Sequence, residues 1–212
     1  MSKDISIIKT LFFNFYYLSF KEAIRMPFHV GKSVKIKHMG KRTSVKVQNV
    51  KKHIGIGLGQ SFGLGKTTFW SIADDASLII RGGGAIIGRG TQIIVDGELD
   101  LGNDFYCNAD CILNAGKKIV FGNSALLGWN VTVMDGDGHT MLNGDTAMPK
   151  YKPIEIGNHV WLAANSSVLK GSCIANDSVV AYGGIVSKNI DQSNVLIGKQ
   201  NKILRTNVNW SV

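Results

Sequence analysis

Residues 156–190 repeat with a period of six. An aliphatic residue stands at every sixth position, and a smaller residue follows four places later. The aliphatic set is Ile156, Leu162, Val168, Ile174, Val180 and Val186, and the smaller set is Val160, Ser166, Ser172, Ser178 and Gly184. Neither a helix nor an alternating strand has this period. A triangular coil of parallel strands has it, because each side points one aliphatic residue inward, and stacked coils bury a column that one coil could not bury alone.

The same rhythm begins near Ile87 and is then disturbed in two ways. Two-residue insertions follow Glu98 and Lys118 at equal intervals, which predicts coils of about twenty residues with an outward bump at one repeated corner. Between Val133 and Ile156 the repeat stops altogether. A long excursion from a regular solenoid is usually functional or disordered. We therefore expect a protruding loop over residues 134–155.

The N-terminal region differs from the repeats in charge and composition. The net charge of +9 is concentrated there, because residues 1–52 hold twelve Lys and Arg against Asp4 and Glu22. Alternating apolar residues between Val34 and Val50 suggest short strands or an irregular first coil. We expect three regions: an N-terminal cap over 1–53, a β-helix domain over 54–190 and a tail over 191–212.

A short aromatic run, Leu11 to Phe20, lies within the basic region and is flanked by Lys9, Lys21 and Arg25. The run is too short to span a bilayer. It fits a helix that caps the open end of the coil stack, or a segment that brings the protein to an anionic membrane surface. These two interpretations are compatible. Nucleic-acid binding is not expected, since no nucleic-acid-binding motif accompanies the charge.

The excursion opens with the sequence DGDGHT and carries the best candidate for chemistry, His139. A histidine outside the coil is within reach of a substrate and can act as a general base near neutral pH. Asp135 and Asp137 are close enough in sequence to orient the imidazole ring or to favour its protonated form. Ordinary surface placement is the alternative for a lone loop histidine. The broken repeat and the two acidic neighbours favour function.

The three cysteines, Cys107, Cys111 and Cys173, form no metal-ligand spacing with a histidine and cannot all pair. This pattern, together with the lack of a visible secretory signal, indicates a reduced, cytoplasmic chain.

The hexads, the DGDGHT excursion and the run IGNHVWLAANSSVLKGSCIANDSVVAYGGIVSKNI resemble the left-handed β-helix (hexapeptide-repeat) acyltransferases. The similarity covers roughly residues 80–206 and is greatest to the bacterial sugar and polysaccharide O-acetyltransferases. The expected fold is therefore an all-β, left-handed parallel β-helix with an N-terminal cap and a protruding active-site loop. Its handedness follows from the resemblance alone, because left-handed parallel crossovers depart from the general rule.

The resemblance implies an acetyl-CoA-dependent O-acetyltransferase. The acceptor would be a sugar hydroxyl of a bacterial cell-surface polysaccharide or its lipid-linked precursor, and the enzyme would be a homotrimer with no metal. His139 would take the hydroxyl proton as the oxygen attacks the thioester, and backbone N–H groups would stabilise the oxyanion. No covalent acyl-enzyme is expected. We expect the protein to be cytoplasmic, and the membrane-surface interpretation of the aromatic run would add peripheral contact with the inner membrane surface.

The resemblance also assigns individual residues. Trp161 would lie along the pantetheine arm, the backbone amides of Ala163 and Ala181 would pair with it, and the CoA phosphates would meet Ser187, Lys188, Lys202 and Arg205. The acceptor side would include Asn108, Trp129, Asn130 and Asp135, with Asp137 assisting His139. The family often has Gly at positions 163 and 181. The asparagine near position 108 is out of register with the small-sugar enzymes, which favours a glycan acceptor.

Three alternatives remain open at this point. A small soluble acceptor, such as a free sugar or an antibiotic, would need no membrane-facing N-terminus. A non-catalytic solenoid scaffold would need neither the histidine loop nor a phosphate-binding tail. A γ-type carbonic anhydrase would need three converging histidines, whereas His139 and His159 fall on different coils.

Overall fold

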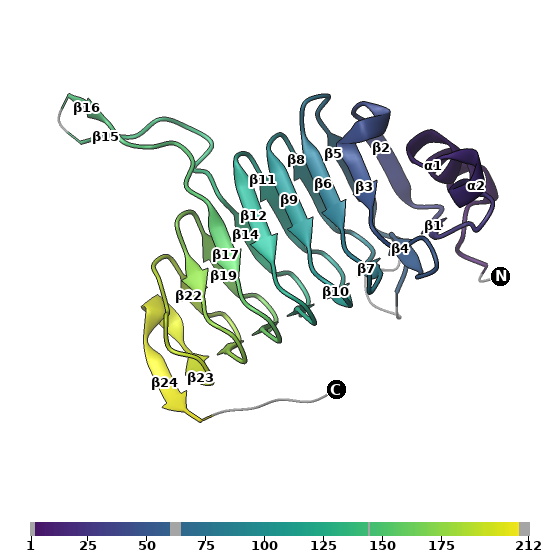
Figure 1. Cartoon of the computed structure of the whole chain (residues 1–212). Helices are drawn as coiled ribbons and strands as arrows, with labels where there is room; N and C mark the ends of the chain where they lie inside the picture. The colour runs from purple at the N-terminus through teal and green to yellow at the C-terminus, as the bar shows by residue number, and fades with distance from the viewer. Residues whose placement is uncertain (1–2, 60–64, 144, 208–212) are drawn as a thin grey trace.

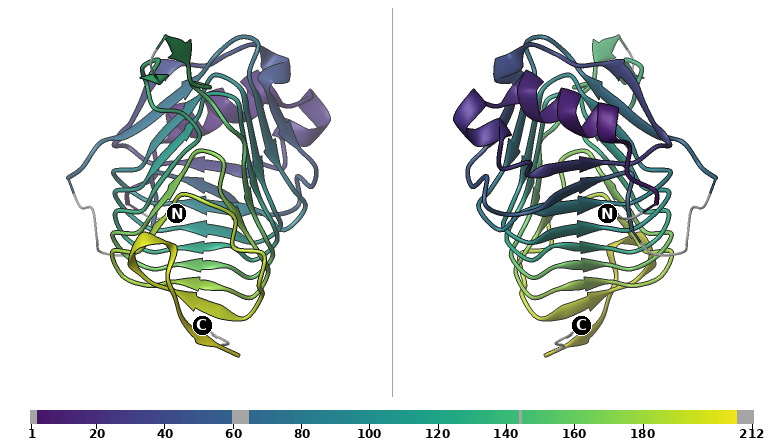
Figure 2. Two further views of the ribbon diagram at one scale, coloured as in Figure 1. Left: turned by 90° about the vertical axis from the view of Figure 1, so that its left-hand side faces the viewer. Right: turned by 90° about the vertical axis from the view of Figure 1, so that its right-hand side faces the viewer.

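The structure is a computed structural model that describes residues 3–59, 65–143 and 145–207, apart from the side chains of Gln200 and Arg205. Short parallel strands wind through successive triangular coils (Figure 1, Figure 2). Each side of the triangle contributes one strand per coil to one of three sheets. This arrangement confirms the expected all-β parallel β-helix.

The three sheets are named here in the order in which the chain meets them. Sheet 1 contains β1 (Phe28–Val30), β4 (Ile54–Ile56), β7 (Ala85–Ile87), β10 (Phe105–Cys107), β13 (Leu126–Leu127), β18 (Trp161–Leu162), β21 (Val179–Val180), β23 (Val195–Ile197) and the antiparallel β24 (Ile203–Thr206). Sheet 2 contains β2 (Val34–His38), β5 (Thr68–Ile72), β8 (Gln92–Val95), β11 (Ile112–Ala115), β14 (Thr132–Met134), β19 (Ser167–Leu169) and β22 (Ile185–Val186). Sheet 3 contains β3 (Val45–Val47), β6 (Ser77–Ile80), β9 (Glu98–Leu101), β12 (Lys118–Phe121), β17 (Ile154–Ile156) and β20 (Cys173–Ile174).

The register between coils places each predicted aliphatic residue on its counterpart in the next coil. In sheet 1, Cys107 pairs with Leu127, Leu127 with Leu162, and Leu162 with Val180. All four side chains have no solvent exposure. Such columns on the three sheets together form one hydrophobic core, and the hexad interpretation is confirmed.

Close approach of the backbones at the corner between sheets 3 and 1 requires glycine. A Cβ on Gly102 would overlap the carbonyl of Gly122, and a Cβ on Gly122 would overlap that of Gly157. The asparagine that follows each of these glycines supports the coil before it: the Oδ1 atom of Asn123 accepts from the Asn103 amide at 2.9 Å, and that of Asn158 from the Asn123 amide at 2.8 Å. Gly-Asn pairs therefore hold this corner in register.

The first coil begins earlier than predicted. Strands β1, β2 and β3 pair in parallel with β4, β5 and β6, and the inward residues Phe28, Val30 and Val34 are buried. The predicted boundary at residue 53 is therefore wrong, because the irregular segment after residue 27 already forms a complete coil. Within the described residues, the helices α1 (Ile7–Tyr17) and α2 (Phe20–Ala23) cap the N-terminal end of the stack, and single-turn 3₁₀ helices lie at Arg42–Ser44 and Lys199–Asn201.

The excursion grows out of the corner where the two-residue insertions lie. These insertions extend the turn between sheets 2 and 3, at Asp96–Gly97 and Gly116–Lys117. In the following coil the chain leaves the same corner after β14 and returns at β17. Residues 135–153 form an arm whose tip is the antiparallel hairpin β15 (Leu142–Asn143) and β16 (Thr146–Ala147), and the arm projects away from the coils (Figure 1).

Asp135 anchors the base of the arm to the coil below it. Its carboxylate accepts backbone N–H bonds from Gly116 and Lys117, each at 2.7 Å, and from Lys118 at 2.5 Å. The side chain has no solvent exposure. Buried backbone amides need acceptors, so this single carboxylate satisfies the whole extended corner and fixes where the arm starts.

We expect Leu113→Ala, in the buried column, to lower the free energy of unfolding by about 2–5 kcal/mol, because it removes a fully buried side chain and leaves a cavity. Urea unfolding followed by circular dichroism measures the change. The same substitution at Leu142, which is 65% exposed on the arm tip, is the matched control and should change stability by less than about 0.5 kcal/mol. Equal losses in both variants would contradict the column as the source of stability.

We expect Asp135→Asn to destabilise the protein by about 1–3 kcal/mol, because the amide loses charge-assisted acceptance of buried N–H groups. Thermal unfolding measures the loss, and limited proteolysis reports opening of the arm. The exposed Asp145→Asn, also on the arm, is the control. A melting temperature for Asp135→Asn that matches the Asp145→Asn value would disprove the anchoring role.

Candidate active site

Backbone hydrogen bonds join the outgoing and returning segments of the arm near its base and towards its tip. Near its base the Lys152 amide donates to the Asp135 carbonyl at 2.9 Å, and the Asp137 amide donates to the Lys150 carbonyl at 3.2 Å. Towards the tip the Met148 amide donates to the Met141 carbonyl at 2.8 Å. These bonds lie on either side of His139, which itself stands in a bend between the base of the arm and the hairpin of β15 and β16.

Lys170, in the turn after β19, holds the arm against the coil. Its Nζ atom forms an ion pair with the Asp137 carboxylate and donates to the Pro149 carbonyl at 2.8 Å. The Lys170 side chain is 16% exposed, so solvent screens this pair less than a surface pair. One ammonium group thereby joins both strands of the arm to the next coil.

The geometry corrects the expected roles of both aspartates near His139. The Asp137 carboxylate is paired with Lys170, so the prediction that it orients the imidazole is not supported. The prediction that Asp135 contacts the acceptor is wrong, because its carboxylate is buried and bonded to three backbone amides. Both residues build and hold the arm. His139 itself is exposed on the arm, where a hydroxyl-bearing acceptor can reach its ring.

A second cluster of predicted residues lies at the corner between sheets 1 and 2. Trp129 is 43% exposed there. Its neighbour Asn130 has a φ of 55° and donates through Nδ2 to the Asn165 Oδ1 atom at 2.7 Å. One coil earlier, the half-buried Asn108 donates through Nδ2 to the Leu127 carbonyl at 3.1 Å. The structure therefore brings these three residues to one edge, with the Asn108 and Asn130 amides bonded within the coil stack.

Trp161 begins β18 and pairs with Leu126 and Val179 on the outer side of sheet 1, where it is half-buried. The chain then turns this corner at Ala163 and, one coil later, at Ala181. The amide of Ala163 donates to the Val180 carbonyl, and that of Ala181 to the Ile197 carbonyl, at 2.9 and 2.8 Å. The predicted use of these two amides for pantetheine is therefore wrong, since both already bond the next coil. The methyl side chains of Ala163 and Ala181 lie at the corner between sheets 1 and 2.

The residues predicted to meet the CoA phosphates lie at the C-terminal end of the stack, where Ser187 and Lys188 follow β22 and precede Ile190, which pairs with Ile174 of β20. The Ser187 amide donates to the Asn201 Oδ1 atom at 2.7 Å, which ties the tail to the end of the stack. Lys188 and Lys202 are exposed. The side chain of Arg205, also predicted to bind CoA, is outside the described part of the structure, and its backbone lies in β24.

The cysteines are poorly suited to nucleophilic chemistry. Cys107 and Cys111 are fully buried. Burial raises the pKa of the Cys107 thiol, and it also raises the pKa of Cys173. A high thiol pKa leaves little thiolate, which is the reactive form.

We call the corner between sheets 1 and 2 that follows Trp161 the Trp161 corner. Within one chain, this corner lies at the start of the sheet 2 strands, whereas the arm that carries His139 leaves from the end of the sheet 2 strand β14. Residues 131–134 separate Asn130 from the base of the arm, a span of about 13 Å for an extended strand. The arm then points away from the coils (Figure 1). Sequence reasoning found the histidine and the corner separately. It did not find Lys170, whose contact with Asp137 joins residues far apart in the sequence.

No family model matches the sequence. The galactoside O-acetyltransferase of Escherichia coli K12 is 29% identical over 110 residues, which are 51% of this chain and 54% of that protein. The polysialic acid O-acetyltransferase of Escherichia coli O1:K1 is 25% identical over 142 residues, which are 66% of this chain and 40% of that protein. The chain thus spans about half the length of the curated relatives it matches, such as the galactoside enzyme.

The fold is similar to that of the solved polySia-specific acetyltransferase NeuO, with a TM-score of 0.57, 18% identity and coverage of 84% of this chain and 82% of that one. Together with the hexad columns, this similarity shows that the chain has the left-handed β-helix fold of the hexapeptide-repeat acetyltransferases, and its sequence is similar to those of named sugar O-acetyltransferases.

Proposed function

We propose that the protein transfers an acetyl group from acetyl-CoA to a sugar hydroxyl, with His139 as the general base. The observation that carries this proposal is the exposed His139 on an arm that is anchored by Asp135 and held by Lys170. A surface histidine without function would not need two separate attachments for the arm that carries it. Similarity to named sugar O-acetyltransferases supplies the reaction class.

The reaction would proceed in one transfer step. The imidazole of His139 takes the proton of the acceptor hydroxyl as its oxygen attacks the thioester carbonyl. The carbon–oxygen ester bond forms and the carbon–sulfur bond breaks, and the proton passes to the departing thiolate of CoA. Backbone N–H groups would stabilise the charged intermediate. The burial of Cys107 and Cys111 supports direct transfer without an acyl-enzyme.

Acetyl-CoA would bind along the corner between sheets 1 and 2. The half-buried Trp161 and the small side chains of Ala163 and Ala181 leave room for an extended pantetheine. Ser187 and the exposed Lys188 follow β22 at the corner between sheets 2 and 3 of the last coil, and the exposed Lys202 precedes β24, so these cations would meet the CoA phosphates at the C-terminal end of the stack.

The separation of His139 from this corner supports a homotrimer as the active form. In an assembly of parallel coil stacks, the arm of one subunit would reach the Trp161 corner of its neighbour. Each site would then take its base from one chain and its CoA contacts from another. Under this proposal Trp129 and Asn130 would face the acceptor from the CoA-binding subunit.

We propose a cell-surface polysaccharide or its lipid-linked precursor as the acceptor, made at the cytoplasmic face of the membrane. An exposed arm does not enclose its substrate, so it admits a polymer. An open hollow of about 550 Å³ lies on sheet 3, which the chain enters after the arm, and Glu155, Asn158 and Asn176 are among the polar residues that line it. The similarity to a polysialic acid O-acetyltransferase favours a glycan, whereas similarity to the galactoside enzyme keeps a small sugar as the second candidate.

We expect His139→Asn to reduce acetyl-CoA turnover by about 10²–10⁴-fold, because amides cannot act as general bases at neutral pH. Free thiol release is measured across polysialic acid, other bacterial glycan fragments and free galactosides. His159→Asn is the matched control, since His159 pairs with Asp177 at 3.0 Å at a coil corner, and it should retain full turnover. Undiminished turnover in His139→Asn would remove His139 from the mechanism, and absence of CoA binding in the wild type would favour a scaffold.

We expect Lys170→Gln to lower turnover by about 10- to 100-fold, because loss of the ion pair to Asp137 lets the arm shift relative to the site. Lys170→Arg should restore most of the activity, as it keeps the charge. Affinity for CoA, measured by calorimetry, should be the same in all three proteins. The control Lys117→Gln alters an exposed lysine beside the same corner. Full turnover in Lys170→Gln would show that the contacts of Lys170 with Asp137 and Pro149 are not needed to position the arm.

A further inference from the structure

The N-terminal cap presents an apolar surface to solvent. On α1 the side chains of Ile7 and Ile8 are 62% and 81% exposed, and those of Phe12 and Phe15 are 46% and 41% exposed. Phe20, in α2, is 75% exposed, and its ring lies 5.9 Å from that of Phe15. We call Ile7, Ile8, Leu11, Phe12, Phe15, Phe20 and Ile24 the cap face. These seven exposed apolar residues all fall on or beside two short helices.

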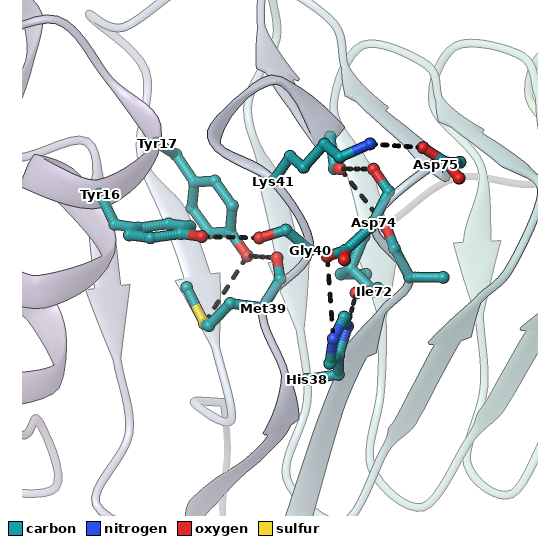
Figure 3. Close-up of polar contacts among 11 residues, drawn as sticks. Tyr16, Tyr17, His38, Met39, Gly40, Lys41, Ile72, Asp74 and Asp75 are labelled. Atoms are coloured by element: carbon teal, nitrogen blue, oxygen red, sulfur yellow. Dashed lines mark hydrogen bonds and ion pairs between the residues drawn. The ribbon is translucent and has the colours of Figure 1, made fainter.

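The polar residues of α1 point inward and fix the orientation of the cap face. Asn14 is fully buried, donates to the Phe28 carbonyl at 2.9 Å and accepts from the Phe28 amide at 3.1 Å. The hydroxyls of Tyr16 and Tyr17 each donate at 2.6 Å, to the carbonyls of Gly40 and Met39 (Figure 3). A rotation of α1 about its own axis that buried the cap face would break these hydrogen bonds. The buried face of α1, which also holds the fully buried Phe13, is thus fixed against the coils, and the apolar cap face is the side left in solvent.

Basic residues surround the cap face. Arg42 donates to the carbonyls of Phe15 and Leu18, at 3.1 and 3.3 Å, which places its guanidinium at the end of α1. Lys9 donates to the Lys32 and Val34 carbonyls, at 2.7 and 2.6 Å. Lys21, Arg25 and Lys32 are exposed on or beside the helices.

The two acidic residues of this region, Asp4 and Glu22, are outnumbered by these basic residues. Glu22 accepts hydrogen bonds from Ser19 within the capping box of α2, and Asp4 forms an ion pair with Arg89 at 2.7 Å. The cap face therefore lies within a field of net positive charge.

We propose that the cap face docks the protein peripherally on an anionic lipid bilayer. Apolar side chains rimmed by Lys and Arg match the boundary between acyl chains and anionic headgroups. A second copy of the chain fits less well, because two such faces would bring like charges together. Across the parts of the chain that the structure describes, no helix is long and apolar enough to cross a bilayer.

The location of α1 at one end of the coil stack allows the cap face to meet a bilayer without obstruction by the coils. The helices lie across the N-terminal end of the coil stack (Figure 2), opposite the C-terminal coils that carry Lys188. A bilayer against that end would leave the sides of the coils and the arm in water. Docking on lipid requires no acetyl transfer, so it is testable independently of the proposed function.

The test measures co-sedimentation of the full chain with vesicles of phosphatidylglycerol and phosphatidylcholine in equal parts, and with phosphatidylcholine alone. The wild type should partition at least about tenfold more strongly to the anionic vesicles, and high salt should reduce this binding. The variant Ile8→Gln/Phe12→Gln/Phe15→Gln should lose it. Lys21→Gln/Arg25→Gln should weaken binding to anionic vesicles only.

The matched control is Met141→Gln/Leu142→Gln/Met148→Gln, which removes three exposed apolar side chains from the arm and should bind vesicles like the wild type. Circular dichroism verifies that each variant is folded. Two results would overturn the proposal. One is a wild-type protein that does not bind anionic vesicles, and the other is binding by the cap-face triple variant as strong as that of the wild type. A change of oligomeric mass in that variant, with no vesicle binding by the wild type, would identify a subunit interface instead.

Discussion

Every feature of this protein depends on the stacking of parallel coils in strict register. Each strand satisfies its backbone groups on the coils before and after it, so a residue at a given position must be compatible with the residue above and below. The columns through Cys107, Leu127 and Leu162 and the glycines at 102, 122 and 157 are two results of this constraint. The column of buried residues requires apolar side chains, whereas the stacked glycines have no room for a side chain.

The arm shows how such a stack accommodates an insertion. Two preceding coils already widen the corner between sheets 2 and 3, and the next coil opens it completely. The exposed backbone that results needs local acceptors and attachments. Asp135 satisfies the amides below the arm, and Lys170 joins both arm strands to the coil above. A histidine carried on this arm can be exposed and still held in place, which is what a general base for an external acceptor requires.

The periodic parts of the fold could be predicted because each hexad repeats the same local requirement. The inward residues are confirmed, and the excursion lies within the expected range, at residues 135–153. The two-residue insertions lie at 96–97 and 116–117, before Glu98 and Lys118 rather than after them. The strands or irregular first coil suggested for residues 34–50 are present, but the domain boundary was placed too late, since residues 28–47 lack a clear hexad and form strands by pairing with the next coil. The break in the repeat singled out His139, whose role stays a prediction. The partners of Asp135 and Asp137 could not be predicted, because their contacts join residues that are distant in the sequence.

The sequence by itself determined the coil, its core and the place where it is interrupted, because these depend on residue type at a fixed period. It also showed a basic, aromatic N-terminus. Only the tertiary structure decided that Asn14 and the tyrosines of α1 face inward while Ile8, Phe12 and Phe15 face water. It likewise decided that Asp137 pairs with Lys170, and that His139 is far from the Trp161 corner. These features depend on which surfaces meet in space, and a one-dimensional period does not specify that.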